Sequence, residues 1–161
     1  MDGFHLADVQ LERLGIRNRK GAPETFDAAG YAALLRRLHN ETSRPIYAPG
    51  FERVLEQPLA AAMVVEPSVR LVISEGNYIL LRNPVWHEAR AALDQVWLVQ
   101  GDDEMRLERL VARHELFGKG HEAAESWVAT VDEANSELIR TESDPPDRTV
   151  HSSADGWRFD H

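Results

Sequence analysis

The side chains that could take part in chemistry are concentrated in a few short segments. The first is Met1-Asp2-Gly3-Phe4-His5, in which an aspartate and a histidine lie close together at the start of the chain. A carboxylate held beside a substrate hydroxyl can accept its proton. Taken alone, the segment is more typical of a frayed end, because terminal residues are seldom fixed. Asp2 and His5 therefore need support from elsewhere in the sequence.

A second candidate carboxylate, Glu75, comes directly after the apolar run 69–73 and before Gly76-Asn77-Tyr78. Ligands of open α/β sheets bind beyond the carboxyl ends of the strands. A carboxylate at this place could hold Mg²⁺ through water, since hard cations take oxygen ligands. The alternative is a structural cap at the end of a strand.

Basic residues form two groups in an otherwise acidic chain. The run Arg17-Asn18-Arg19-Lys20-Gly21 could bind an anion or could be a solvated turn. Arg106, Arg109 and Arg113 lie along one side of a predicted helix, with His114 and Lys119 close by. Like charges at i, i+4 destabilise a helix by a few tenths of a kcal/mol, roughly, and a bound anion would remove that cost. The alternative is a solvated basic face.

The elements that must position these residues alternate between helices and short apolar runs. Helices are predicted after Asp27, with Tyr31, Leu34, Leu35 and Leu38 inward; from Asp102 or Asp103 to Gly118, with Leu107, Leu110, Val111 and His114; from Glu122 to Arg140, with Trp127, Val131, Ala134 and Leu138; and after Asn83, with Val85, Trp86, Ala89 and Leu93.

Strands are predicted at 69–73, at 96–99 and near Thr149 and Val150, while the stretch from Arg44 to Arg53 reads as an ordered loop. The strand runs are continuously apolar, which is typical of strands buried on both faces. Strands separated by helices indicate an α/β fold with a parallel sheet.

Composition narrows the classes of protein. The chain has 161 residues, 43% of them apolar, and forms one predicted domain, 1–161. It has no cysteine, which excludes disulfides, thiolate zinc sites and cysteine nucleophiles. A net charge of −9 opposes binding to nucleic acid or to anionic membranes. With no apolar run of membrane length, we expect a cytoplasmic protein.

Six segments, taken in order, resemble the motifs of the P-loop kinases that include uridine kinase, phosphoribulokinase and bacterial pantothenate kinase: MDGFHLAD, RKGAPETFD, YAPGFER, SEGNYILL, LERLVARHELFGKG and VDEANSELI. The chain is especially similar to bacterial proteins called nucleoside or fructose-transport kinases. The resemblance covers nearly all of it. It implies a five-stranded parallel sheet flanked by helices, with a lid-like segment around 106–120, and a reaction that uses ATP and Mg²⁺.

The resemblance also implies a role for each matching residue. Asp2 would accept the proton of the attacking hydroxyl, Glu75 would help to hold Mg²⁺, and Arg113 would face the transferred phosphoryl group. The acceptor, a nucleoside, sugar or pantothenate-like alcohol, would contact His5, Arg19, Lys20, Tyr47, Arg53, Asn77 and Tyr78. The nucleotide and lid residues would be Arg109, Arg113, His114 and Lys119.

One motif of the group is missing from these 161 residues. The group resembles other P-loop enzymes in opening with a strand and a GxxxxGK loop, followed by Ser or Thr, that cradles the ATP phosphates. The resemblance therefore implies that the first strand and the phosphate loop are absent here, and that this chain alone is a weak or inactive kinase. In the group that strand lies between the strands predicted at 69–73 and 96–99. We expect an exposed sheet edge there, and low stability or association of copies.

Two alternatives remain at this point. The chain could be a non-catalytic binding or assembly module derived from such a kinase, which the missing phosphate loop favours. It could also be a metal-dependent hydrolase that uses Asp2, His5 and Glu75, although the sequence has no HExxH or comparable ligand spacing.

Overall fold

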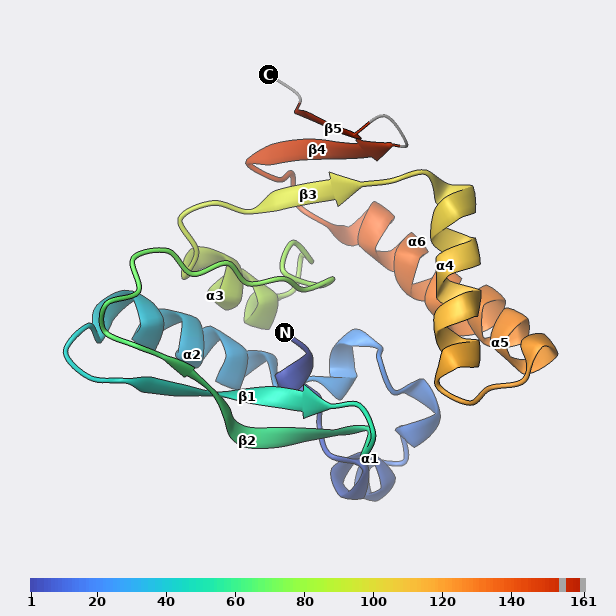
Figure 1. Cartoon of the computed structure of the whole chain (residues 1–161), viewed down its shortest axis with the longest axis horizontal. Coiled ribbons are helices and arrows are strands. Elements are labelled where there is room, and N and C mark those ends of the chain that lie inside the picture. Colours follow the sequence, from blue (N-terminus) through green and yellow to red (C-terminus); the bar gives the residue numbers. More distant parts are fainter. Residues whose placement is uncertain (154–155, 160–161) are drawn as a thin grey trace. The chain divides into compact units, whose positions relative to one another are not determined.

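The chain contains two compact units, Met1–Asp94 and Gln95–His161. They are seen in a computed structural model that describes residues 1–153 and 156–159. The fold is mixed α/β, as the sequence predicts (Figure 1). The first unit holds the helices α1 (Asp8–Leu14), α2 (Ala28–Asn40) and α3 (Pro84–Ala91) and the strands β1 (Ile46–Glu52) and β2 (Gln57–Val65). The second holds α4 (Asp103–Leu116), α5 (His121–Trp127), α6 (Glu133–Glu142), β3 (Trp97–Gln100), β4 (Arg148–Ser153) and β5 (Gly156–Phe159).

Side-chain caps fix the starts of three predicted helices. Asp27 Oδ1 accepts from the Gly30 amide at 2.9 Å at the start of α2, and Asp102 Oδ1 accepts from Met105 N at 3.0 Å at α4. Asn83 Oδ1 accepts from Val85 N at 3.1 Å at α3. Each cap satisfies an amide that has no partner within its own helix. The prediction of these three helices is confirmed.

The core of the first unit lies where α2 and α3 pack together. Tyr31 and Leu35 of α2 and Trp86 and Ala89 of α3 are buried, as predicted. Val85 was predicted to point inward but is 38% exposed. It is the second residue of α3, and the buried stripe of that helix runs through Trp86 and Ala89 instead.

The stretch from Arg44 to Arg53 was predicted to be a loop, and this is wrong. Residues 46–52 are β1, paired antiparallel with β2. The pairing register shifts between Ala48 and Gly50, where β2 carries extra residues opposite Pro49. Such a bulge interrupts the regular alternation of a strand, which hid the hairpin in the sequence.

The apolar run 69–73 was predicted to be a strand, and it is not one. It is extended but belongs to neither sheet, and Val69, Leu71 and Ile73 are 47%, 75% and 85% exposed. A strand exists only through hydrogen bonds to a neighbour, and the described residues provide none for this run.

The second unit contains the predicted parallel pair. β3 and β4 run parallel, with Val99 opposite Val150, and β5 adds an antiparallel strand that was not predicted. The sheet order is β3-β4-β5. A single parallel pair, rather than a five-stranded parallel sheet, is therefore present in 1–153 and 156–159.

The predicted helix from Glu122 to Arg140 is helical throughout but changes phase in the middle. A π-helical turn, Val128–Asp132, joins α5 to α6. The wider turn rotates the following residues around the axis. As a result Ala134 and Leu138, predicted to point inward, are exposed, and Ser136 and Ile139 are half-buried instead.

Candidate active site

A short 3₁₀ turn, Asp2–Phe4, sets the position of the predicted catalytic aspartate. Gly3 packs against β1 so closely that a Cβ atom there would overlap the Pro49 carbonyl oxygen. On the other side, Phe4 packs edge-on against the buried ring of Tyr31, with 5.3 Å between ring centroids. The first residues are thus an ordered part of the first unit, not a frayed end.

The Asp2 carboxylate is half-exposed and faces one guanidinium group. Arg53 Nη2 lies 3.4 Å from Asp2 Oδ2, with 54% of the arginine side chain and 44% of the aspartate side chain exposed. The pair is open enough for a ligand to enter between or beside its members. Both residues belong to the predicted site.

His5 lies beneath Asp2 and is mostly enclosed by aromatic rings. Its Nδ1–H donates to the Asp2 carbonyl oxygen at 2.8 Å, and its ring lies 4.0 Å from Phe26 and 5.1 Å from Phe51 between centroids. Burial lowers the pKa of His5 below its usual 6.5, although the Asp2 carbonyl and carboxylate act in the opposite direction. A neutral His5 is therefore a fixed support for the Asp2 main chain.

Glu75 lies next to the same turn through main-chain contacts. The Met1 nitrogen donates to the Glu75 carbonyl oxygen at 2.9 Å, and a Cβ atom on Gly76 would overlap the Met1 side chain. The buried Tyr31 hydroxyl lies 2.8 Å from Ser74 Oγ, one residue before Glu75. The Glu75 carboxylate itself is 82% exposed. Two carboxylates, Asp2 and Glu75, thus come from segments joined side by side, and Glu75 Oε1 lies 3.7 Å from the Met1 nitrogen.

The remaining predicted acceptor residues divide between the interior and the surface. Tyr78 is buried, and its hydroxyl donates to the Gly21 carbonyl at 2.5 Å. Asn77 is exposed. Arg19 pairs at the surface with Glu24 at 2.7 Å. Tyr47 is 61% exposed and lies on the side of β1 opposite the buried Ile46 and Ala48.

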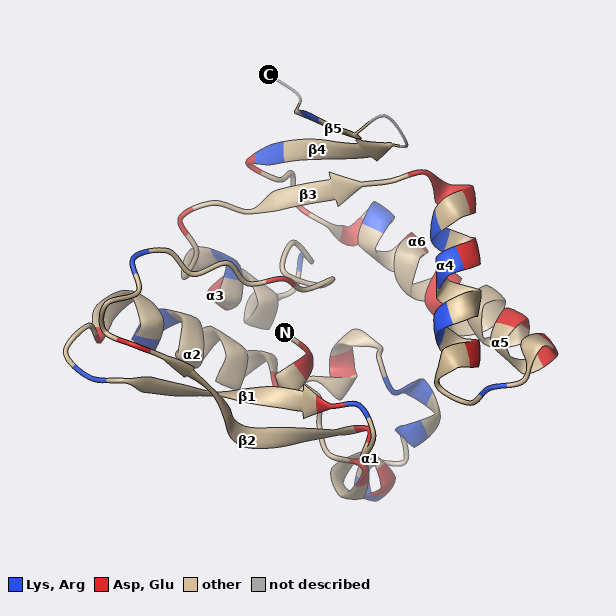
Figure 2. Ribbon diagram, viewed as in Figure 1, with Lys and Arg blue, Asp and Glu red and all other residues tan. Residues whose placement is uncertain are grey.

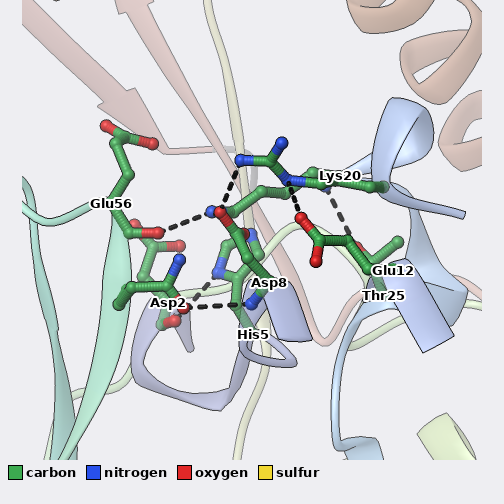
Figure 3. A network of polar contacts seen from close by, with 10 residues as sticks. Asp2, His5, Asp8, Glu12, Lys20, Thr25 and Glu56 are labelled. Carbon is green, nitrogen blue, oxygen red and sulfur yellow. Dashed lines mark hydrogen bonds and ion pairs between the residues drawn. The ribbon is translucent and has the colours of Figure 1, made fainter. Parts of the chain in front are cut away.

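Lys20 is held in a network that the sequence did not reveal. Its ammonium donates to Asp8 Oδ1 at 2.7 Å and to the Glu56 carbonyl at 2.5 Å, as Figure 3 shows. Arg17 Nη2 contacts the other Asp8 oxygen at 2.9 Å. These partners are 9 and 12 residues from Asp8, and no local period in the sequence connects them.

The loop that carries Lys20 is closed by another residue that sequence reasoning passed over. Thr25 is completely buried, and its hydroxyl accepts from Gly21 N at 3.0 Å and donates to the Ala22 carbonyl at 2.7 Å. A buried hydroxyl with both bonds satisfied fixes a turn at little cost.

The predicted lid residues belong to the second unit, and they differ in their contacts. Arg106 is engaged, with Nη2 2.6 Å from Glu133 Oε1 and Nη1 3.2 Å from Ser136 Oγ. By contrast, Arg109 and Arg113 are exposed, and their side chains form no hydrogen bond or ion pair with any described residue. Figure 2 shows basic residues along α4 among acidic ones. Two adjacent guanidinium groups are therefore available to an anion.

His114 and Lys119 make contacts inside the second unit. His114 Nε2 lies 2.8 Å from Asp132 Oδ2, in the π-helical turn, and the Lys119 ammonium lies 4.6 Å from the centroid of the Trp127 ring. These contacts join α4 and the loop after it to the α5–α6 segment. Both side chains are therefore structural here, whatever they contact when a ligand is bound.

The part of the chain that the structure describes, residues 1–153 and 156–159, has neither a metal-binding cluster nor a membrane-spanning helix. No group of three or more histidine, aspartate or glutamate side chains there could hold a metal ion. The hydrolase alternative, with Asp2, His5 and Glu75 as ligands, finds no such cluster. None of the described helices is long and apolar enough to cross a membrane.

Comparison with known proteins shows the class to which this fold and site belong. No family model matches the chain. The chain is 33% identical over 148 residues to an ATP-dependent kinase-like protein of Aspergillus versicolor, covering 86% of each. It is 34% identical over 122 residues to a protein of Schizosaccharomyces pombe named as a candidate uridine kinase, and spans 52% of that protein.

Solved structures of similar fold are also described as kinases. A candidate fructose transport system kinase from Silicibacter sp. TM1040 superposes with a TM-score of 0.85 at 36% identity, covering 92% of this chain and 71% of that one. A Saccharomyces cerevisiae protein described as a candidate P-loop kinase with a circular permutation, YFH7, has a TM-score of 0.81 at 25% identity, with 55% of its chain covered. The fold is that of a P-loop kinase. The chain belongs to the family of ATP-dependent kinase-like proteins that the Aspergillus protein represents.

Proposed function

We propose that this chain supplies the acceptor side and the lid arginines of a kinase that transfers phosphate from ATP to a hydroxyl group of a small metabolite. The observation that carries the proposal is the position of Asp2. Its half-exposed carboxylate faces Arg53 at 3.4 Å, is fixed from below by His5, and comes from a segment joined to Glu75. A proton acceptor, a cation and a second carboxylate in one region are what phosphoryl transfer to a hydroxyl requires.

Each group has a chemical task in this proposal. The acceptor hydroxyl would lose its proton to an Asp2 oxygen as its own oxygen bonds to the γ-phosphorus and the bond to ADP breaks. Arg53, with His5, Arg19, Lys20, Tyr47, Asn77 and Tyr78, would form or support the acceptor site. Arg109 and Arg113 would neutralise charge on the transferred group. When bound, Mg²⁺ would offset phosphate charge, and the exposed Glu75 carboxylate could hold it through water.

Because the phosphate-binding loop is missing, we expect this chain to bind its two substrates with different affinities. No GxxxxGK sequence occurs among the 161 residues, so the main-chain cradle for ATP phosphates is not in this chain. We expect the chain to bind an acceptor and to bind Mg-ATP only weakly.

Isothermal titration of the chain with nucleosides, sugars, pantothenate and Mg-ATP tests this proposal. We expect one acceptor class to bind and Arg53→Gln to weaken its affinity about tenfold, as expected when one charged hydrogen bond is lost. Glu66→Gln, at an exposed carboxylate outside the site, is the matched control. Tight Mg-ATP binding together with no acceptor binding would contradict the proposal.

A non-catalytic assembly module is the second candidate, and the missing loop supports it. Such a module has no physical need for an open Asp2–Arg53 pair or for two unpartnered lid arginines. The same titration separates the two, because a module would bind neither the acceptors nor Mg-ATP.

A further inference from the structure

Asp8 lies beside the proposed active site and has none of the predicted roles, although its partner Lys20 was predicted to contact the acceptor. Asp8 is the first residue of α1. Its carboxylate accepts from Lys20 Nζ at 2.7 Å and from Arg17 Nη2 at 2.9 Å, and its main-chain amide donates to Gln57 Oε1 at 3.0 Å. Three segments of the first unit therefore meet at one aspartate.

The pair formed by Asp8 and Lys20 is more enclosed than the pair formed by Asp2 and Arg53. The two side chains are only 22% and 19% exposed, whereas those of Arg53 and Asp2 are about half exposed. Partial burial disfavours the ionised carboxylate, but the hydrogen bonds from Lys20 and Arg17 outweigh it and lower the pKa of Asp8 to about 2. A charge-assisted pair sheltered in this way holds its geometry better than an exposed pair does.

Lys20 connects Asp8 to the turn of the β1–β2 hairpin. Its ammonium also donates to the Glu56 carbonyl at 2.5 Å, and it lies 5.7 Å from the Phe51 ring centroid. Glu56 has a φ of 53°, a left-handed conformation that a glutamate adopts only when neighbouring contacts hold it. The Lys20 contact is one such restraint.

The same turn carries the arginine that faces the proposed base. Arg53 lies at one end of residues 53–56, and Glu56 lies at the other. With the Glu56 carbonyl fixed by Lys20 and Gln57 fixed by the Asp8 amide, the hairpin turn can move little relative to α1. Figure 3 shows Glu56, Lys20 and Asp8 in line, with Asp2 and His5 next to them.

We propose that Asp8 is a positioning residue which, through Lys20 and the Glu56 carbonyl, fastens the 53–56 turn so that Arg53 stays within reach of Asp2. In this role the Lys20 ammonium is occupied by protein oxygens. Arg53 is then the cation that meets the polar group of the acceptor. The inference rests on the proposed function only for the meaning of the Asp2–Arg53 pair, because the anchor itself can be tested without activity.

The first test is amide hydrogen exchange with Asp8→Asn, Lys20→Met and Lys20→Arg in the whole chain. We expect Asp8→Asn and Lys20→Met to raise exchange about tenfold in residues 53–57 while residues 28–40 in α2 keep their protection. Lys20→Arg should largely retain protection. Arg13→Gln, on the same helix but bonded to Gln10 and not to the Asp8 network, is the control. Unchanged exchange at 53–57 in both disrupting variants would overturn the proposal. If Asp8→Asn exposes the whole unit, Lys20→Met still decides it, since methionine removes the charge but keeps an unbranched side chain of similar length.

The second test is the NMR signal of the Arg53 side-chain Nε–H group. If Asp8 only stabilised α1, replacing it would not change the chemical shift of this signal. We expect Asp8→Asn to shift it in the direction that Asp2→Asn does, and Arg13→Gln to leave it unchanged. A signal insensitive to Asp8→Asn would refute the positioning role even if acceptors bind. If no acceptor binds but both tests succeed, the anchor stands and the proposed function fails.

Discussion

At the scale of single residues, the position of Asp2 depends on its neighbours in space. His5 donates to its carbonyl, Gly3 allows the close approach to Pro49, and Arg53 faces its carboxylate. The motif MDGFH predicted Asp2 and His5 as site residues, and its order within the first unit agrees with that. The roles themselves remain predictions.

The partly buried His5 makes the stability of the first unit depend on pH. Its pKa is lowered by burial, so the unfolded chain binds a proton more readily than the folded chain. The stabilisation is complete above about pH 6.5 and is lost as the pH falls through the lower folded pKa. Urea unfolding between pH 7 and 5 should show stability falling with pH, and His5→Gln should reduce that slope.

His121 provides a contrasting control for this experiment. It is exposed, and the hydrogen bond that its Nδ1–H donates to Glu115 raises its pKa. Its contribution therefore has the opposite sign, present below pH 6.5 and lost as the pH rises through the folded pKa. If His5→Gln left the slope of the parent chain unchanged, His5 would not be buried in neutral form.

At the scale of elements, the sequence predicted what local signals encode. The caps Asp27, Asn83 and Asp102 fixed three helices correctly. The errors occurred where the local period breaks. The bulge opposite Pro49 concealed β1, and the π-helical turn at 128–132 shifted the inward face of α6. No rule of alternation anticipates either irregularity.

The Asp8–Lys20 network and the exposure of Arg109 and Arg113 could not be predicted for a different reason. Both depend on which distant residues meet in the fold, and Arg106 was taken by Glu133 while its neighbours were left open. The spacing along the helix predicted only that these three arginines lie on one side of it. Their tertiary contacts differ, because the Arg106 side chain pairs with Glu133 and the other two side chains have no such partner among the described residues.

The contact between the Asp2 turn and β1 gives a prediction at this scale. Gly3→Ala should destabilise the first unit by about 1–3 kcal/mol, because the new Cβ would force the Pro49 carbonyl and the turn apart. Gly101→Ala is the matched control, since nothing lies within 4 Å of a Cβ there. The free energy of unfolding in urea measures both. Equal stability of the two variants would show that the close approach of Gly3 is absent.

At the scale of the whole molecule, the P-loop kinase class predicted from six ordered motifs is confirmed by relatives and by solved structures. Composition and motifs could not show which apolar segments pair with a neighbouring strand. The apolar run 69–73 has the composition of a buried strand, yet three of its side chains are half to largely exposed. A strand is a property of a pair, and single-segment patterns describe only one member.

This exposed run leads to a prediction about association. Like the uncharged strand β2, which is tan throughout in Figure 2, it presents apolar side chains at the surface. We propose that copies of the chain associate through 69–73. Sedimentation should show a mass that rises with concentration, and Leu71→Ser with Ile73→Ser should lower it toward the monomer. A sharp monomer boundary at all concentrations, with a cooperative melt, would contradict this.

The most direct test of the account is phosphate transfer itself, followed with labelled ATP and with the chain in excess over an acceptor that binds, so that slow turnover is visible. If Asp2 is the base, Asp2→Asn should reduce the rate by about 10²–10⁴ while acceptor affinity changes little. Glu66→Gln should match the parent chain. An Asp2→Asn chain that transfers phosphate at the parent rate would remove Asp2 from the mechanism and contradict the account.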